Sequence, residues 1–497
     1  MDSIEYKYDL LYGGGYSIKE YYMESGNPRQ MRGASELLNE CAADVKRHLK
    51  KNGINEDHIF TGGATLSAKV PHDNGKKYAA EAEDIFRNKC RTASAAFVAA
   101  PFNDDNDYQE ARSRAIYEYE CRKASKFTSW KFQDEKDDKH LMKRDNEADC
   151  GFEYADSGAP PRCPRCRMRT PHYQCKHNNE EEKLYLCTSC AKRERKSGER
   201  KYELRNECDS EYGFEINTLP DIADSNGRIA LLYADINNLG REGDKMTSFE
   251  MDKTFHSSVG KTVKEAVHTA VRRAMTVEKN NKKSNARFEI VTLGGDDICL
   301  LLPGDTALLT AMSIVNEFDN AEEFTKIADI YNTKIDLSIS VAACVANDTT
   351  PLAYMEGIVS SALEKAKTIA REKERSVVNL SYFEQPSDLF PMTAEDLKEF
   401  VCLLEKTSSD DVAVTALRNI SEARRELVSK NAINEEFTRG FTLFLDYYLA
   451  RDITSIHRIK PIMTEIRDKY GSKNPWRDFV TWQNQKLCKG VANIESR

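Results

Sequence analysis

The sequence has no apolar run of about 18 residues, and this absence excludes a membrane-spanning helix. Its first ten residues include acidic side chains and no apolar core, so we predict no secretory signal and a cytoplasmic location. An excess of positive charge is also absent, because 73 basic and 81 acidic residues give a formal net charge of −8. This balance argues against a protein whose whole surface binds nucleic acid. With 497 residues, the chain is expected to form several globular domains.

Cysteine is present in quantity, with 14 residues, but without an export signal a disulfide framework is not expected. Cys163-x2-Cys166 and Cys187-x2-Cys190 are separated by 20 residues, which is a zinc-ribbon spacing. Four thiolates around Zn²⁺ form a closed tetrahedral site with no position open for chemistry, so we predict a structural zinc ion. Spare candidates, one of which could replace a member of the four, are Cys150, His172, Cys175 and His177.

A dense basic tract, residues 192–205, follows the cysteine cluster. We interpret it as the solvated face of a helix, which is the usual setting of such a charge run. Contact with RNA or with a partner subunit is the alternative.

Composition divides the chain into four parts. An almost wholly charged stretch, residues 131–149, separates a first α/β unit from the cysteine module, and the pattern from residue 391 onward is helical. The predicted parts are a first α/β unit over 1–149, a cysteine module over 150–215, a second α/β unit over 216–386 and a helical domain over 387–497.

The order strand, helix, glycine hairpin occurs twice, which indicates duplication of one domain. Residues 10–12 precede Gly62-Gly63 in the first copy, and residues 231–233 precede Gly294-Gly295 in the second. The copies differ in charge, because the second has Asp235 at its strand end where the first has Gly14. The sequence after the glycines differs too, with Asp296-Asp297 in the second copy and Ala64-Thr65 in the first. We therefore predict that the second copy can hold a metal ion and the first cannot.

The acidic residues of the second copy are predicted to converge if the hairpin lies beside the first strand. Carboxylates about 4 Å apart repel by roughly 4 kcal/mol at an effective dielectric constant near 20, so a cation or a proton must accompany them. Oxygen ligands favour Mg²⁺ or Mn²⁺, and Gly294 and Gly295 would leave room for a phosphate-bearing substrate. An exposed turn is the alternative for the glycine–aspartate motif alone, and the strand position of Asp235 argues against it.

At this point the sequence resembles a known family. LLYADINNLG (231–240) and LGGDDICLLLPG (293–304) are similar to the palm polymerase-cyclase domain of the large subunit of type III CRISPR effector complexes, a fold shared with GGDEF-type nucleotide cyclases. MRGASELLNE (31–40) and IFTGGATLSAKVP (59–71) resemble that subunit's degenerate first palm. The resemblance covers essentially the whole chain. It implies an α+β fold with two ferredoxin-like palm domains, an intervening zinc ribbon and a C-terminal helical domain.

The resemblance also implies an activity, the conversion of ATP into 3′–5′ linked cyclic oligoadenylate for antiviral signalling. Asp235, Asp296 and Asp297 would be the catalytic Mg²⁺ or Mn²⁺ ligands. Guide RNA, target RNA and other effector subunits are the implied partners, and a homodimer is left open. The positions expected near the nucleotides are Asn237, Asn238, Gly294, Gly295, Lys367 and, in the degenerate palm, Gly62 and Gly63.

One departure from the family concerns the N-terminus. Many members begin with an HD nuclease domain, whereas here the first palm starts within ten residues of Met1 and the nine histidines form no early cluster. We therefore expect no DNase activity. Two other functions remain open, a cyclic dinucleotide synthase of the GGDEF-like class and a non-catalytic scaffold subunit of an RNA-guided complex. The GGDD-Ile sequence disfavours the first and the three carboxylates disfavour the second.

Overall fold

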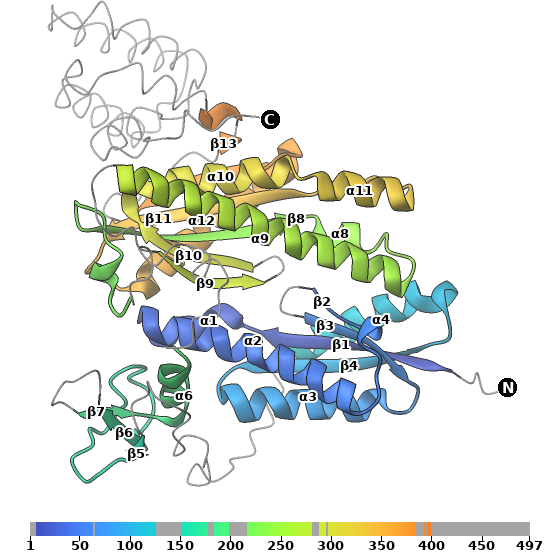
Figure 1. The fold of residues 1–497 in the computed structure, drawn as a ribbon, viewed down its shortest axis with the longest axis horizontal. Helices are drawn as coiled ribbons and strands as arrows, with labels where there is room; N and C mark the ends of the chain where they lie inside the picture. The colour runs from blue at the N-terminus through green and yellow to red at the C-terminus, as the bar shows by residue number, and fades with distance from the viewer. Residues whose placement is uncertain are drawn as a thin grey trace, which may run out of the picture.

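The chain forms two units of matching topology, each built around a sheet, with a small cysteine-rich module beside them (Figure 1). The computed structural model describes residues 6–62, 65–125, 152–176, 183–197, 216–280, 288–294, 297–383, 392–393 and 395–398. The predicted helical domain lies almost entirely outside these residues, as do Gly63, Gly295 and Asp296.

The first unit contains a four-stranded antiparallel sheet in the order β2-β3-β1-β4. Leu11 on β1 packs in the cluster with α2 and α3, whereas its neighbour Leu10 packs with α4, so the two faces of the sheet are covered by different helices. The elements are β1 (Tyr8–Tyr16), α1 (Ile18–Met23), α2 (Pro28–Lys51), η1 (Glu56–His58), β2 (Ile59–Gly62), β3 (Thr65–Pro71), α3 (Gly75–Cys90), β4 (Ser94–Phe102) and α4 (Asp105–Ala124).

The second unit repeats this order and extends it. Its sheet runs β13-β12-β11-β8-β10-β9, in which the four strands from β11 to β9 correspond to β4, β1, β3 and β2 of the first unit. The elements are η4 (Leu219–Asp221), β8 (Arg228–Asn237), α8 (Leu239–Gly243), α9 (Phe249–Asn280), β9 (Glu289–Gly294), β10 (Asp297–Pro303), η5 (Gly304–Thr306), α10 (Ala307–Asp319), α11 (Glu322–Tyr331), β11 (Ser338–Asn347), α12 (Leu352–Lys373), β12 (Val377–Tyr382) and β13 (Met392–Thr393).

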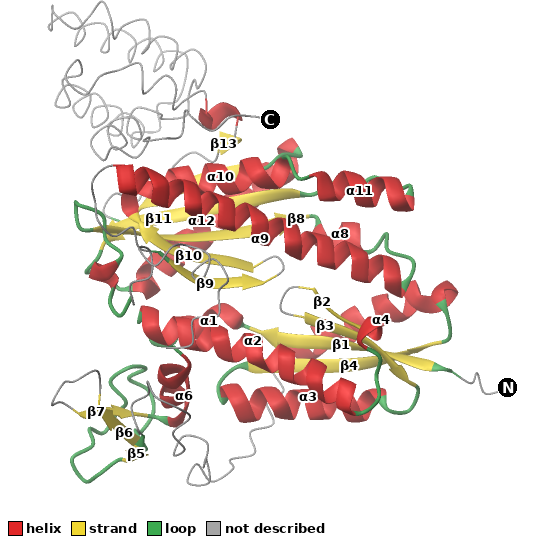
Figure 2. Cartoon of the chain, viewed as in Figure 1, coloured by secondary structure: helices red, strands yellow, loops and turns green. Residues whose placement is uncertain are grey.

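The second sheet is covered on both faces, which explains the continuous apolar sequence of β8. Figure 2 shows α9 and α10 over one face of this sheet. Leu232 packs with these two helices, and Leu231 packs with α12 and the first unit on the other face. Each fully buried leucine contributes about 1.5–3 kcal/mol. The duplication and the two ferredoxin-like sheets predicted from the sequence are thus confirmed.

The cysteine module is a three-stranded sheet with one helix. It consists of β5 (Glu153–Tyr154), β6 (Tyr173–Lys176), β7 (Lys183–Leu186) and α6 (Thr188–Lys196), and α6 contacts α2 of the first unit. Among the described residues, no helix has the length and apolar character that crossing a bilayer requires.

A buried charge network joins α4 of the first unit to α9 of the second. Arg112 Nε donates to Asp252 Oδ2 over 3.1 Å, and the Tyr108 hydroxyl donates to the same oxygen over 2.7 Å. Asp252 is 3% exposed and Arg112 is 6% exposed. Burial alone would raise the pKa of Asp252, but the neighbouring His256 and Arg112 outweigh it and hold this pKa below 3.8. The two units are therefore held together in part by an ion pair that water does not screen.

Replacing Arg112 by Met should lower the free energy of unfolding by about 3–5 kcal/mol at pH 7, because Asp252 would stay buried without its guanidinium partner and with only His256 and Tyr108 beside it. A carboxyl whose pKa is depressed stabilises the fold above its unfolded-state pKa and loses that contribution as pH falls through the folded-state value. The difference between wild type and variant in urea titrations should therefore shrink below about pH 4.

Arg114→Met is the matched control, since Arg114 lies on the same helix but pairs with Glu110 at the surface. It should cost about 0.5 kcal/mol or less. An equal loss in both variants would contradict the assigned role of the buried pair.

Candidate active site and cysteine site

The second sheet places Asp235 and Asp297 next to each other. The antiparallel ladder between β10 and β8 ends at Ile298 with Ala234, and Asp297 and Asp235 are the next residues beyond this pair. Residues directly opposite each other on antiparallel strands point to the same face. That face also carries Tyr233 and Cys299, and it packs toward the first unit. The two carboxylates therefore meet on the side of the sheet that faces the other copy.

Burial and the neighbouring charges have opposing effects on the pKa of Asp235. Burial raises the pKa of Asp235, and the charge of Asp297 raises it further, whereas Lys367 lowers it. Lys367 Nζ on α12 lies 3.2 Å from Asp235 Oδ2. Burial lowers the pKa of Lys367, but Asp235 and Glu364 together more than offset this, and the net pKa lies above the ordinary value. The fold therefore places Lys367 beside Asp235, and both residues were predicted site residues.

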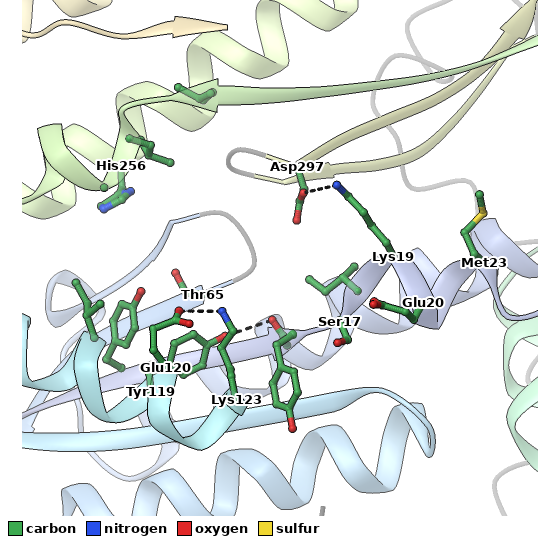
Figure 3. A pocket seen from close by; sticks show the side chains of 18 of the residues that line it. Ser17, Lys19, Glu20, Met23, Thr65, Tyr119, Glu120, Lys123, His256 and Asp297 are labelled. Atoms are coloured by element: carbon green, nitrogen blue, oxygen red, sulfur yellow. Dashed lines mark hydrogen bonds and ion pairs between the residues drawn. The ribbon is translucent and has the colours of Figure 1, made fainter. Parts of the chain in front are cut away.

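A second lysine comes from the first unit, and the sequence motifs did not point to it. Lys19 Nζ on α1 lies 3.9 Å from Asp297 Oδ1 and 4.9 Å from the centre of the Tyr233 ring (Figure 3). Lys19 follows the end of β1, the strand that corresponds to β8, so only the pairing of the two copies could have identified it.

The two predicted asparagines have different surroundings. Asn237 is 4% exposed, and its amide donates to Ser338 and accepts from Ser340, so that it joins β8 to β11. Asn238 has a left-handed backbone (φ 65°) and lines a cavity beside the carboxylates. Asn237 is not among the described residues that line this cavity.

The cavity lies between the two units and has a volume of about 900 Å³. Asp297 borders it from the second unit, and Thr65 and Lys123 border it from the first (Figure 3). Arg112 also lines it from the first unit. Thr65 pairs with Gly62 and occupies the place in the first copy that Asp297 has in the second. The degenerate hairpin therefore faces the same space as the acidic one.

Packing against the described protein atoms does not explain why residue 294 in the acidic hairpin is a glycine. A Cβ atom built at Gly294 would have no protein atom within 4 Å, and among the described residues Gly294 is not one of those with positive φ. Open space at this point leaves room for a ligand. Carboxylate oxygens from two strands, next to such space, are a donor set that suits a hard divalent cation such as Mg²⁺ or Mn²⁺.

The four predicted zinc ligands come together in the cysteine module. The Sγ atoms of Cys163, Cys166, Cys187 and Cys190 all lie within 4.8 Å of one another, and all four residues are buried. Cys166 and Cys187 are 3.9 Å apart. A tetrahedron with Zn–S bonds of about 2.3 Å has edges of about 3.8 Å, so the group fits a zinc ion. Cys175 and His172 are in the same module but outside the group of four.

Comparison with known proteins supports this reading of the fold. Residues 228–376 match the family model for Cas10/Cmr2, second palm domain. None of the curated proteins matches the sequence. The structure is similar to that of Csm1 in T. onnurineus, with 15% identity and a TM-score of 0.61, over 98% of this chain and 70% of that one. The resemblance to the large subunit of type III CRISPR complexes is confirmed, and at this identity it is the fold that is shared.

Two further solved structures are similar. A Csm1–Csm4 cassette in complex with pppApApA has 15% identity and a TM-score of 0.60, over 99% of this chain and 70% of that one. A cassette in complex with cA4 has 14% identity and the same TM-score, again over 99% and 70%.

Zinc binding can be tested directly. Cys187→Ser should reduce bound zinc from one ion per chain to a small fraction, since a hydroxyl replaces one of four thiolates, and the melting temperature should fall. Elemental analysis and thermal melts measure both effects. Cys121→Ser, at an exposed position outside the group, is the control and should change neither. Full zinc content in Cys187→Ser would remove this residue from the ligand set.

Lys367→Met should tighten Mn²⁺ binding several-fold, because Asp235 loses the cation 3.2 Å away. Binding should also weaken as pH falls toward the raised pKa of Asp235, since a proton then competes for the same oxygen. Electron paramagnetic resonance of free Mn²⁺ measures both trends. Lys365→Met, at an exposed position on the same helix, should leave the affinity unchanged. Weaker Mn²⁺ binding in Lys367→Met would contradict this account.

Proposed function

We propose that this protein is a nucleotidyl cyclase that converts ATP into cyclic oligoadenylate. The observation that carries the proposal is the pair of carboxylates on neighbouring strands, Asp235 and Asp297, of which Asp297 lines a cavity between two copies of one fold. A cavity of about 900 Å³ is large enough for nucleotide-sized ligands.

The chain's own residues would act mainly by positioning and electrostatics, so no protein nucleophile is required. Asp235, Asp297 and Asp296 would hold the divalent ions. Those ions, when bound, would lower the pKa of a ribose 3′-hydroxyl and offset charge on the triphosphate. The 3′-oxygen of one ATP would then bond to the α-phosphorus of the other, pyrophosphate would leave, and the hydroxyl proton would pass to solvent.

The cationic residues around the cavity would bind the triphosphates. Lys367 would serve the ATP held by the acidic copy, and Lys123 lines the part of the cavity formed by the degenerate copy. Gly294, Gly295, Gly62 and Gly63 would let the phosphates approach the two hairpins, and Asn238 would contact a nucleotide from the cavity wall. Zinc in the cysteine module would be structural, because four thiolates leave it no open position.

We also infer that the chain works as a subunit of an RNA-guided complex. The support is its likeness to Csm1 solved together with Csm4 in the type III-A CRISPR-Csm interference complex, with 14% identity and a TM-score of 0.60. Guide RNA and target RNA would then reach the protein through its partner subunits.

Asp235→Asn and Asp297→Asn should each reduce product formation about 100-fold or more, because an amide cannot supply the anionic ligand. The double variant Asp296→Ala with Asp297→Ala should abolish it. Purified protein with ATP and Mg²⁺ or Mn²⁺, with and without target RNA, followed by mass spectrometry, measures the product. Incubation with each of the four nucleoside triphosphates identifies the preferred base.

Asp329→Asn is the control, since Asp329 is exposed on α11 and should leave the yield unchanged. Near-normal synthesis by Asp235→Asn would remove the assigned role. Copurification with RNA, without turnover of ATP under any of these conditions, would favour a scaffold subunit.

A further inference from the structure

The segment Met31–Ser35 is buried throughout, although it lies at the start of a helix and outside the cavity. It lies near the start of α2, which begins at Pro28 after Asn27, and the Asn27 side chain accepts a hydrogen bond from the backbone N–H of Gln30. Burial of an arginine, Arg32, at this place requires partners for its charge and its donors. Those partners come from three different parts of the chain.

Arg32 is 2% exposed and forms an ion pair with Glu289, which is 1% exposed. Its Nε atom lies 3.0 Å from each carboxylate oxygen, and Nη2 lies 2.5 Å from Oε2. The same guanidinium donates to the carbonyl of Ser197 over 3.2 Å and to that of Ile216 over 2.8 Å. Ser197 caps the end of α6, and Ile216 precedes the second unit. One side chain thus joins the first unit, the cysteine module and the second unit.

Glu289 is the first residue of β9, and β9 leads directly to the acidic hairpin. Gly294 at the other end of β9 pairs with Asp297. Because β9 is the last strand in the order of the second sheet, its backbone is paired with β10 on one side, and α2 contacts it as well. The hairpin that carries Asp297 is therefore held by β8 through β10 and by α2 through Glu289.

The residue after Arg32 shows how closely the cysteine module is joined to the same helix. A Cβ atom on Gly33 would lie 1.9 Å from the carbonyl oxygen of Arg193 on α6, so the two helix backbones touch at a point where only glycine fits. Arg193 itself is fully buried, with its guanidinium over the Tyr21 ring at 4.2 Å and an ion pair to Glu24. The interpretation of the basic tract as a solvated face is therefore wrong at Arg193.

We propose that Arg32 is a positioning residue that fixes the β9–β10 hairpin, and with it Asp297, to the docked cysteine module. The planar guanidinium contacts both oxygens of Glu289 and two carbonyls at once, a geometry that an ammonium group cannot reproduce. The module is thereby linked to the acidic hairpin although it lies away from the cavity. The expected effect on turnover rests on the proposed function, whereas the expected effect on the rigidity of the hairpin does not.

The test compares Arg32→Lys and Glu289→Gln with the control Arg47→Lys. Arg47 lies on the same helix and pairs with Asp44 of that helix rather than with α6 or β9. Hydrogen exchange of residues 289–294 and 297–303 should become about tenfold faster in the first two variants and stay unchanged in the control. The turnover number should fall about tenfold or more with KM for ATP unchanged, because the reacting groups are misplaced rather than removed.

Gly33→Ala tests the link to the module, since the added methyl group must push α6 away from α2. Exchange should then accelerate in α6 and in the β9–β10 hairpin together. Circular dichroism confirms that each variant is folded. Glu289→Gln keeps the shape of the original side chain, whereas Arg32→Lys changes it.

Unchanged hairpin exchange in folded Glu289→Gln, or equal acceleration in Arg47→Lys, would overturn the role of Arg32. Faster exchange of α6 alone in Gly33→Ala would overturn the link to the module. Hydrogen exchange needs no turnover, so a wild-type protein without cyclase activity would refute the proposed function and leave this test intact.

Discussion

The arrangement of the active face depends on one constraint, the placement of two carboxylates side by side at the ends of apolar strands. Asp235 and Asp297 are neighbours because β8 and β10 are registered through Ile298 and Ala234. Burial and the neighbouring charge of Asp297 both disfavour the charged form of Asp235, so positive charge must be supplied nearby. Lys367 supplies it from α12 and Lys19 from the first unit. The site is therefore electrostatically complete only when both units are present.

The first copy of the fold has kept the geometry and changed the chemistry. Gly14 and Thr65 face each other on β1 and β3 in the register that Asp235 and Asp297 occupy on β8 and β10. Neither residue can act as an anionic ligand. The degenerate copy lines the cavity with both signs of charge, and its Lys19 lies beside Asp297. Under the proposed function, Lys19 is the contribution of this copy to the charge balance at the carboxylates.

The sequence alone predicts those features that are determined by residues close together in the chain. The apolar run of residues 229–233 predicts a buried strand, the paired glycines predict the hairpins, and the Cys-x2-Cys spacing predicts the thiolate cluster, because each signal lies within a few residues. Contacts between distant segments could not be predicted in this way. Lys19 and Arg112 follow no motif, and the burial of Arg193 arises from the docking of α6 onto α2, which a charge run does not reveal.

The edge of the second sheet gives a reason why the two copies stay joined. An edge strand exposes unpaired backbone groups and tends to associate with other chains unless something covers it. In the described part of the sheet, β9 is such an edge, and α2 of the first unit lies against it with Arg32 paired to Glu289. Separation of the units would expose this edge and leave Glu289 without its cation, in addition to removing Lys19 from Asp297. The same interface therefore protects the sheet and completes the charge balance of the site, so selection for either property retains the degenerate copy.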